Sequence, residues 1–276
     1  MNSNIQNLTR MNLKQSARFN LRWIQALFAR ELRAAVLNRS FQIFCALGLA
    51  GGLACTIFSE NAAAAAVFYL QIAHYFVSLF ALLAGVSSAQ TEREEWQLLL
   101  TQPLPRPAYA IGKFVTLLSI LAGVLILFFL PAVVAGAGSK VAWLFLQTLL
   151  LTSVFLALGL AVGYFARDRA HGLIVSVSAW LFLLFGVDLI ALFAARWSTI
   201  QDFPTLWVVC LMFNPFDAFR VDALFSLEQV PAEAASTIPL ASWWIDHTAI
   251  WFGAIALVWS VTMVSLAGLR LSRWEE

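Results

Sequence analysis

The sequence is poor in charged residues: Asp, Glu, Lys and Arg make up only 12% of its 276 residues, whereas 61% are hydrophobic. A soluble domain carries about a quarter charged residues, so this deficit excludes an ordinary water-soluble fold and indicates lipid as the solvent. The net charge of +2 is too small to indicate a nucleic-acid partner. Long apolar runs instead predict one membrane domain over residues 1–276.

Residues that hold metals or perform catalysis are also scarce. The three cysteines form no CxxC pair, the three histidines have no HExxH spacing, and the four methionines do not gather into a copper path. The P-loop pattern GxxxxGK[ST] is missing, and no Ser–His–Asp arrangement can be argued. We therefore predict no catalytic residue, no metal site and no cofactor bound by this chain. An intramembrane enzyme is the class that the sequence favours least.

Long apolar stretches are what the sequence does contain. About 20 apolar residues cross a bilayer as a helix, and six stretches come close to or exceed this length. They predict an all-α membrane protein with six transmembrane helices. The predicted spans are residues 41–58, 62–89, 114–137, 141–166, 172–195 and 249–269.

The distribution of Lys and Arg predicts the orientation of these spans. Fourteen of the 17 basic residues precede span one, follow spans two and four, or lie in the tail, and only three occupy the other side. Since basic residues remain in the cytoplasm, both termini should be cytoplasmic. The three exceptions are Lys140, Arg196 and Arg220.

The segment before span one has its own pattern. Within a basic cytoplasmic segment over residues 1–40, apolar residues recur at helical spacing over residues 18–39. Arginines occupy positions on the other side of this helix. This pattern predicts an amphipathic helix in the cytoplasmic interface. A membrane-surface anchor is the simpler interpretation, and a partner-binding face is the alternative.

The segment between spans two and three predicts a second cytoplasmic helix, at residues 91–106. Thr91 has the properties of a helix N-cap with Glu94 completing a capping box, and Pro103 would end the helix. Its apolar side must be covered by the chain itself, by the bilayer surface or by a partner's groove. The residues assigned to a coupling contact are Glu92, Glu94, Glu95, Trp96, Leu99, Leu100 and Arg106.

The third unusual segment is the acidic outer loop at residues 196–246, which is too apolar for a free loop and is expected to contain short helices. Asn214 before Pro215 predicts a helix start, and Asp217 and Arg220 are spaced to pair on one face. A solvated outer face is the simpler interpretation of its charge, and a docking surface for a periplasmic partner is the alternative. The residues assigned to that contact are Asn214, Asp217, Arg220 and Asp222.

Three polar residues lie within the spans, in the outer half of the bilayer: His74, Gln147 and Asp188. Such residues usually face the interior of a bundle. They predict either one polar cluster lining an outward cavity or three separate contacts that hold helices together. The Gly48-x-x-x-Gly52 and Gly159-x-x-x-Gly163 pairs predict close helix approach, within the chain or at a dimer interface.

A basic amphipathic helix enters span one, the segment EREEWQLLLTQPLPRPAYAIGKF links spans two and three, and a long outer loop joins spans five and six. This order of features resembles the ABC-2 class of ABC transporter permeases. The usual Gly-Thr before the Leu pair is replaced by Trp96 and Gln97. The residues that match the pattern of the class are Glu94, Glu95, Leu99, Leu100, Pro103, Arg106, Gly112 and Lys113.

The resemblance implies a permease of the bacterial inner membrane that is not itself an enzyme. It implies a homodimer, with residues 91–106 as the coupling helix seated on a separate cytoplasmic ATPase that binds ATP and Mg²⁺. The outer NPFDAFR and the chain length further resemble the branch of the class that matures the copper sites of nitrous oxide reductase. That likeness implies a periplasmic partner for the loop at 196–246. An unrelated ABC-2 exporter and a non-transporting scaffold remain the alternatives.

Overall fold

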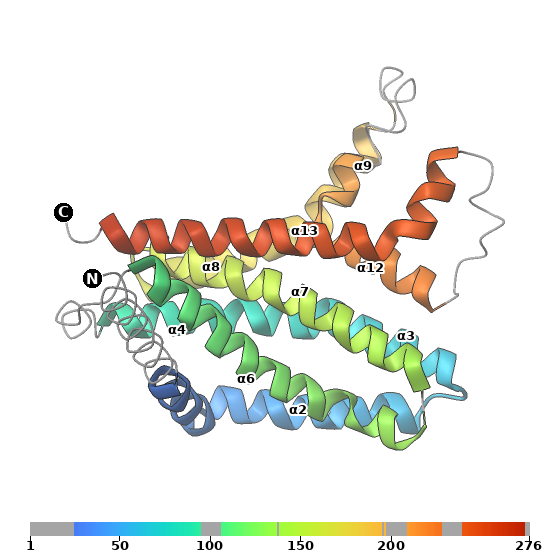
Figure 1. Cartoon of the computed structure of the whole chain (residues 1–276), viewed down its shortest axis with the longest axis horizontal. Helices are drawn as coiled ribbons and strands as arrows, with labels where there is room; N and C mark the ends of the chain where they lie inside the picture. The colour runs from blue at the N-terminus through green and yellow to red at the C-terminus, as the bar shows by residue number, and fades with distance from the viewer. Residues whose placement is uncertain are drawn as a thin grey trace, which may run out of the picture.

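The computed structural model is an elongated helical bundle, described here for residues 25–94, 106–136, 138–194, 196, 209–227 and 239–273 (Figure 1). This part of the chain contains helices and no strand, which agrees with the predicted all-α class. The principal helices are an N-terminal helix (Gln25–Leu37), α2 (Arg39–Ile57), α3 (Ala62–Ile72), η1 (Ala73–Val77), α4 (Ser78–Glu94), α6 (Arg106–Val134), α7 (Gly138–Phe165), α8 (Arg169–Leu181), η2 (Phe182–Gly186), α9 (Val187–Ala194), α12 (Pro215–Ser226) and α13 (Pro239–Ser272).

Five of these helical stretches are long and apolar enough to cross a membrane, and the N-terminal helix with α2 makes a sixth as a bent pair. The bend between the two is 76°, so the N-terminal helix runs across the direction of α2. Phe28, Leu32 and Val36 repeat every four residues on this helix and are exposed. This apolar stripe fits the membrane-surface helix predicted within residues 18–39.

The helices extend beyond the predicted spans, because hydropathy detects only their apolar parts. The helix of span three begins at Arg106 rather than at residue 114, and that of span six begins at Pro239 rather than at residue 249. Lys113, which the sequence places at the end of a loop, therefore lies two turns inside α6.

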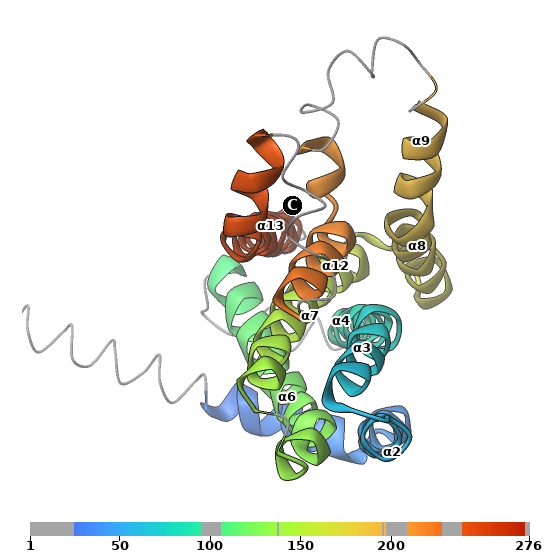
Figure 2. The same ribbon diagram turned by 90° about the vertical axis from the view of Figure 1, so that its right-hand side faces the viewer.

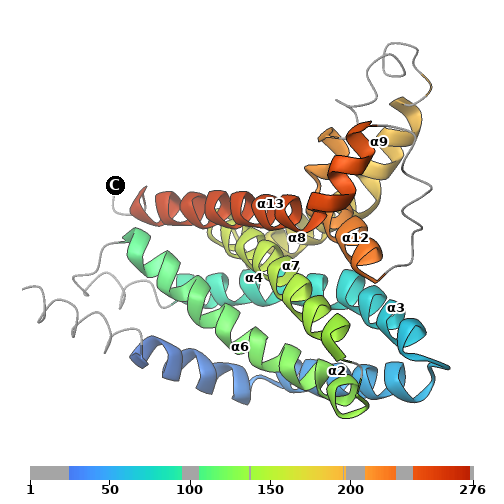
Figure 3. The same ribbon diagram turned by 45° about the vertical axis from the view of Figure 1, so that its right-hand side comes forward.

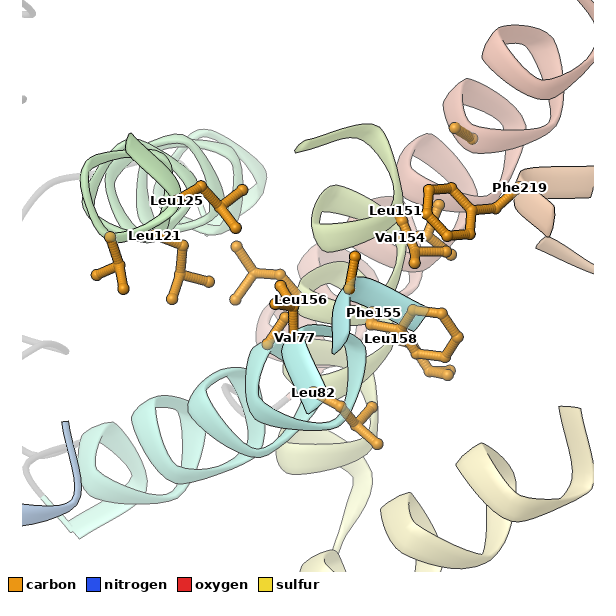
Figure 4. Packing of buried hydrophobic residues seen from close by; sticks show 14 of the residues in the cluster. Val77, Leu82, Leu121, Leu125, Leu151, Val154, Phe155, Leu156, Leu158 and Phe219 are labelled. Atoms are coloured by element: carbon orange, nitrogen blue, oxygen red, sulfur yellow. The ribbon is translucent and has the colours of Figure 1, made fainter. Parts of the chain in front are cut away.

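The helix α7 forms the centre of the bundle, with α4, α6, α12 and α13 around it (Figure 2). In α7, 72% of the most apolar stretch is buried, against 22–50% in the other four candidate spans. Figure 4 shows how the core is filled from several helices, with Phe219 of α12 beside Leu151 and Val154 of α7. The helices α4, α6, α12 and α13 are thus positioned against α7, whereas α2 packs against α6 and α3.

Glycines let α4 and α7 touch along their backbones. A Cβ atom on Gly159 would lie 2.2 Å from the Leu82 carbonyl oxygen, and one on Gly163 would lie 2.6 Å from the Ala89 Cβ. Gly85 makes the same close approach from the α4 side. The Gly159–Gly163 pair therefore packs within this chain, which confirms the predicted close approach and makes α4 and α7 one rigid pair.

Two π-helical segments interrupt the spans, η1 before α4 and η2 between α8 and α9. Past η2, α9 turns away from the direction of α8 and rises out of the bundle (Figures 1 and 3). Both segments contribute to the surroundings of α12, through His74 of η1 and Leu183 of η2. Such π-bulges occur frequently at functional sites.

Candidate functional site: a buried ion cluster and an inserted helix

Four charged side chains meet at the end of the bundle where α6 begins and α13 ends, here called the terminal end (Figure 1). Lys113 Nζ lies 2.7 Å from Glu92 Oε1 and 2.8 Å from Glu31 Oε1. Arg30 Nη2 lies 3.1 Å and 2.9 Å from the same two oxygens. We call Arg30, Glu31, Glu92 and Lys113 the ion cluster.

Three of the four members of the ion cluster are removed from solvent, whereas the Arg30 side chain is 43% exposed. Lys113 and Glu92 are 1% and 2% exposed, and Glu31 is also buried. Two tyrosines complete it: Tyr164 donates a hydrogen bond of 2.5 Å to Glu92 Oε2, and Tyr109 donates one to Glu92 Oε1. A buried ion pair is tolerable only when its remaining polar atoms are satisfied in this way, so these contacts fix each member in place.

The N-terminal helix contributes a carboxylate whose charge is maintained by its partners. Burial by itself would raise the pKa of Glu31. The neighbouring Lys113 and Arg30 outweigh that effect and lower the pKa of this carboxyl below its ordinary value. Glu31 is therefore ionised at neutral pH and holds the N-terminal helix to α6.

The ion cluster joins four segments that are far apart in the sequence. Glu92 is at the end of α4 and Lys113 is near the start of α6, so their contact ties the two ends of residues 95–105 together. Arg30 and Glu31 add the N-terminal helix, and Tyr164 adds α7. The ion cluster therefore connects the end of α4 and the start of α6 to the central helix α7.

The structure revises part of the predicted coupling segment. Thr91 is not an N-cap, because α4 continues to Glu94 and the Thr91 hydroxyl donates to the Ser87 carbonyl within the helix. Glu92, assigned to a partner contact, is buried inside the chain. Glu94 ends α4 and Arg106 begins α6. The remaining members lie outside the described residues, and these are Glu95, Trp96, Leu99 and Leu100.

At the opposite end of the bundle, here called the far end, α12 is inserted against the spans. Asn214 caps it as predicted, accepting a hydrogen bond from the Phe216 N–H, and Asp217 pairs with Arg220 at 3.1 Å. The Asn214 amide also donates to the Leu183 carbonyl of η2 at 2.8 Å. The cap stabilises the start of α12, and the contact with η2 holds this helix against the spans.

The three polar residues of the spans do not contact one another in the described part of the structure, but each contacts α12. His74 packs its ring 4.6 Å from that of Phe216, between centroids. Gln147 donates a 2.8 Å hydrogen bond to Asp222, and Asp188 lies 3.8 Å from Arg220. The predicted polar cluster therefore consists of three separate contacts that hold α12.

The residues assigned to a periplasmic partner are mostly on the inner side of α12. Asn214, Asp217 and Asp222 are buried, because their side chains satisfy one another and the neighbouring spans. Arg220, with a side chain 47% exposed, is the member at the surface. A partner can therefore reach the first three residues only if α12 moves.

Raising the pH is expected to loosen α12. Burial and the nearby Asp188 raise the pKa of Asp217, and burial raises that of Asp222 despite its hydrogen bond from Gln147. The folded state thus favours the protonated carboxyls, so their contribution to stability is present at low pH and is lost as the pH rises through the folded-state pKa values. Deuterium uptake of residues 215–226, corrected for intrinsic exchange, should rise from acid to neutral pH, and Asp222→Asn should flatten this rise. A corrected uptake that falls over this range would contradict the prediction.

Comparison with known proteins assigns the class of this fold. The model of the family described as "ABC-2 family transporter protein" matches residues 4–273. The chain therefore belongs to the ABC-2 family and is a multi-pass permease subunit of an ABC transporter, as the resemblance implied. It is 30% identical to the "Probable ABC transporter permease protein NosY" of Pseudomonas aeruginosa over 216 residues, which are 71% of this chain and 75% of that protein.

Four members of the terminal-end site have no role assigned from the sequence, and these are Arg30, Glu31, Tyr109 and Tyr164. Lys113 was counted as a loop charge and matched to a family pattern, although a helix starting at Arg106 would have placed it inside a span. An intramembrane cation requires a buried carboxylate, and Glu92 lies on the preceding span. That pairing rule was the available signal for the ion cluster.

Proposed function

We propose that this chain couples ATP hydrolysis by a separate cytoplasmic ABC ATPase to a movement of α12 at the outer face. The observation that carries the proposal is the buried ion cluster, which ties both ends of residues 95–105 to the N-terminal helix and to α7. The far end of α7 in turn holds α12 through Gln147. Force applied at residues 95–105 thus has a continuous packed route to α12.

The rigid part of this route is the α4–α7 pair. The glycine contacts leave no space for the two helices to slide independently, so a tilt of the terminal end moves the far end as well. We propose that two copies of the chain, each bound to one ATPase, tilt against each other when the nucleotide closes the ATPases. A rigid-body rotation of this kind is a common form of switching transition.

The likeness to NosY supports a more specific role. We propose that the chain serves copper-site assembly of nitrous oxide reductase, with a NosF-like ATPase in the cytoplasm and a NosD-like protein in the periplasm. In this role α12 and Arg220 face the periplasmic partner, with both chain termini in the cytoplasm. The output is then transport of a substrate or mechanical change in that partner.

The test begins with purification of the chain with its partners retained. ATP hydrolysis is then measured together with the deuterium uptake of residues 215–226 in α12. Reversing the charges of Glu94 and Glu95 to Lys should release the ATPase or uncouple it. Glu60→Lys is the matched control, because Glu60 is exposed in the turn between α2 and α3 at the far end. Absence of a nucleotide-binding subunit under conditions that preserve complexes would favour a scaffold and defeat the proposal.

A further inference from the structure

A cavity of about 390 Å³ lies between the N-terminal helix, α4 and α6, beside the ion cluster. This volume falls within the range of small-molecule sites, about 300–1,000 Å³. Its polar wall is at the terminal end and includes Glu31, Ser88 and Lys113, whereas Phe80 and Leu121 line its deep end. The cavity is therefore amphipathic along its length.

The dimensions of the cavity match one leaflet of a bilayer. Its lining on α4 runs from Glu92 to Phe80, which are twelve residues apart and thus about 18 Å along the helix. The hydrocarbon of one leaflet is about 15 Å deep, half of a core of about 30 Å. Ser87, Thr91 and Leu173 line the cavity and are exposed, so it opens to the outside of the bundle. A lipid acyl chain can thus enter while its head group stays at the polar wall.

The polar wall also specifies a type of head group. Among the residues that the structure describes, two carboxylates and two cations balance in this wall, which disfavours a ligand with a large net charge. Glu31 uses Oε1 for both Lys113 and Arg30, whereas its Oε2 has a weak contact of 3.5 Å with Ser88 Oγ. A primary ammonium can donate hydrogen bonds to Oε2 and to Ser88. Arg30, whose side chain is 43% exposed, supplies the positive charge that an adjoining phosphate requires.

We propose that this cavity binds a phospholipid with a zwitterionic head group carrying a primary ammonium, that is, a phosphatidylethanolamine. One acyl chain lies along Ala84 and Leu117 towards Phe80, the ammonium binds Glu31 Oε2 and Ser88, and the phosphate faces Arg30. The bound lipid fills the space between the N-terminal helix and α4. The lipid therefore supports the position of the ion cluster without displacing the ion pairs that Glu31 Oε1 makes with Lys113 and Arg30.

The test uses the purified chain alone, so its result is independent of the ATPase proposal. The chain is exchanged into lipid discs of phosphatidylethanolamine, phosphatidylcholine or phosphatidylglycerol, extracted, and examined by native mass spectrometry. We expect one retained phosphatidylethanolamine per chain, and several-fold less retention of phosphatidylcholine, whose quaternary ammonium has no N–H to donate. Equal retention of the three lipids, or retention of none, would overturn the proposal.

Two variants separate binding in the cavity from general lipid adhesion. Ala84→Phe fills the acyl part of the cavity and should lower retention at least about tenfold, since several methylene groups lose their apolar surroundings. Ala50→Phe on α2 is the matched control, because Ala50 is exposed and does not line the cavity. Ser88→Ala should reduce the preference for ethanolamine over choline while leaving chain insertion intact. Equal retention by Ala84→Phe and Ala50→Phe would contradict the assigned site.

Discussion

Replacing Lys113 by Met is expected to lower the free energy of unfolding by about 3–5 kcal/mol, the cost of removing one partner from a buried ion pair. Lys113 contacts both Glu31 and Glu92, so its loss leaves two buried carboxylates with Arg30 as the cation that remains beside them among the described residues. The measurement is unfolding of the purified chain in detergent, and coupling to the ATPase should be lost in parallel.

Two further variants make this result interpretable. Arg33→Met removes an exposed cation from the N-terminal helix and should change stability by less than about 0.5 kcal/mol. Combining Lys113→Met with Glu31→Gln and Glu92→Gln removes the unpaired charges, so most of the lost stability should return. If Lys113→Met proved as stable as Arg33→Met, the ion cluster could not be what joins the ends of residues 95–105.

Gly159→Ala is expected to destabilise the bundle by about 3 kcal/mol, at the upper end of overpacking effects. The added Cβ would lie 2.2 Å from a backbone oxygen of α4, which cannot rotate away as a side chain can. The two helices must separate, and Gly85 and Gly163 lose their contacts as well. Unfolding in detergent measures the loss of stability. Uncoupling would be seen as ATP hydrolysis that continues without movement of α12.

The control for this variant is Gly123→Ala in α6. A Cβ atom there meets no heavy atom within 4 Å in the described structure, so the change tests helix propensity alone. It should be neutral or stabilise the chain by about 0.5–1 kcal/mol. Equal effects of the two substitutions would show that the close approach of α4 and α7 has no energetic importance.

The membrane class and the helix content could be predicted because they depend on local sequence. Apolar length identified the spans, and Asn214 with Pro215 identified the start of α12 from cap chemistry alone. The spacing of Asp217 and Arg220 correctly predicted a pair, since residues three apart meet on one helical face. Each of these inferences requires knowledge of one helix only.

What could not be predicted depends on which helices are neighbours. Glu31 and Lys113 are ordinary charges in the sequence, and their meeting with Glu92 requires the N-terminal helix, α4 and α6 to converge. The outer loop was expected to present its acids to solvent, but α12 buries Asp222 against Gln147. The π-helical segments likewise have no signal in composition, because hydropathy is insensitive to one extra residue in a turn.

The central claim is that ATP acting at the terminal end moves α12 at the far end, and one measurement tests it directly. Deuterium uptake of residues 215–226 is followed in the reconstituted permease–ATPase complex, with and without ATP. We predict that uptake rises with ATP in the wild-type complex and stays at its nucleotide-free level in Lys113→Met, at a temperature where both remain folded. Uptake that does not respond to ATP in a wild-type complex with full coupled activity would contradict this account.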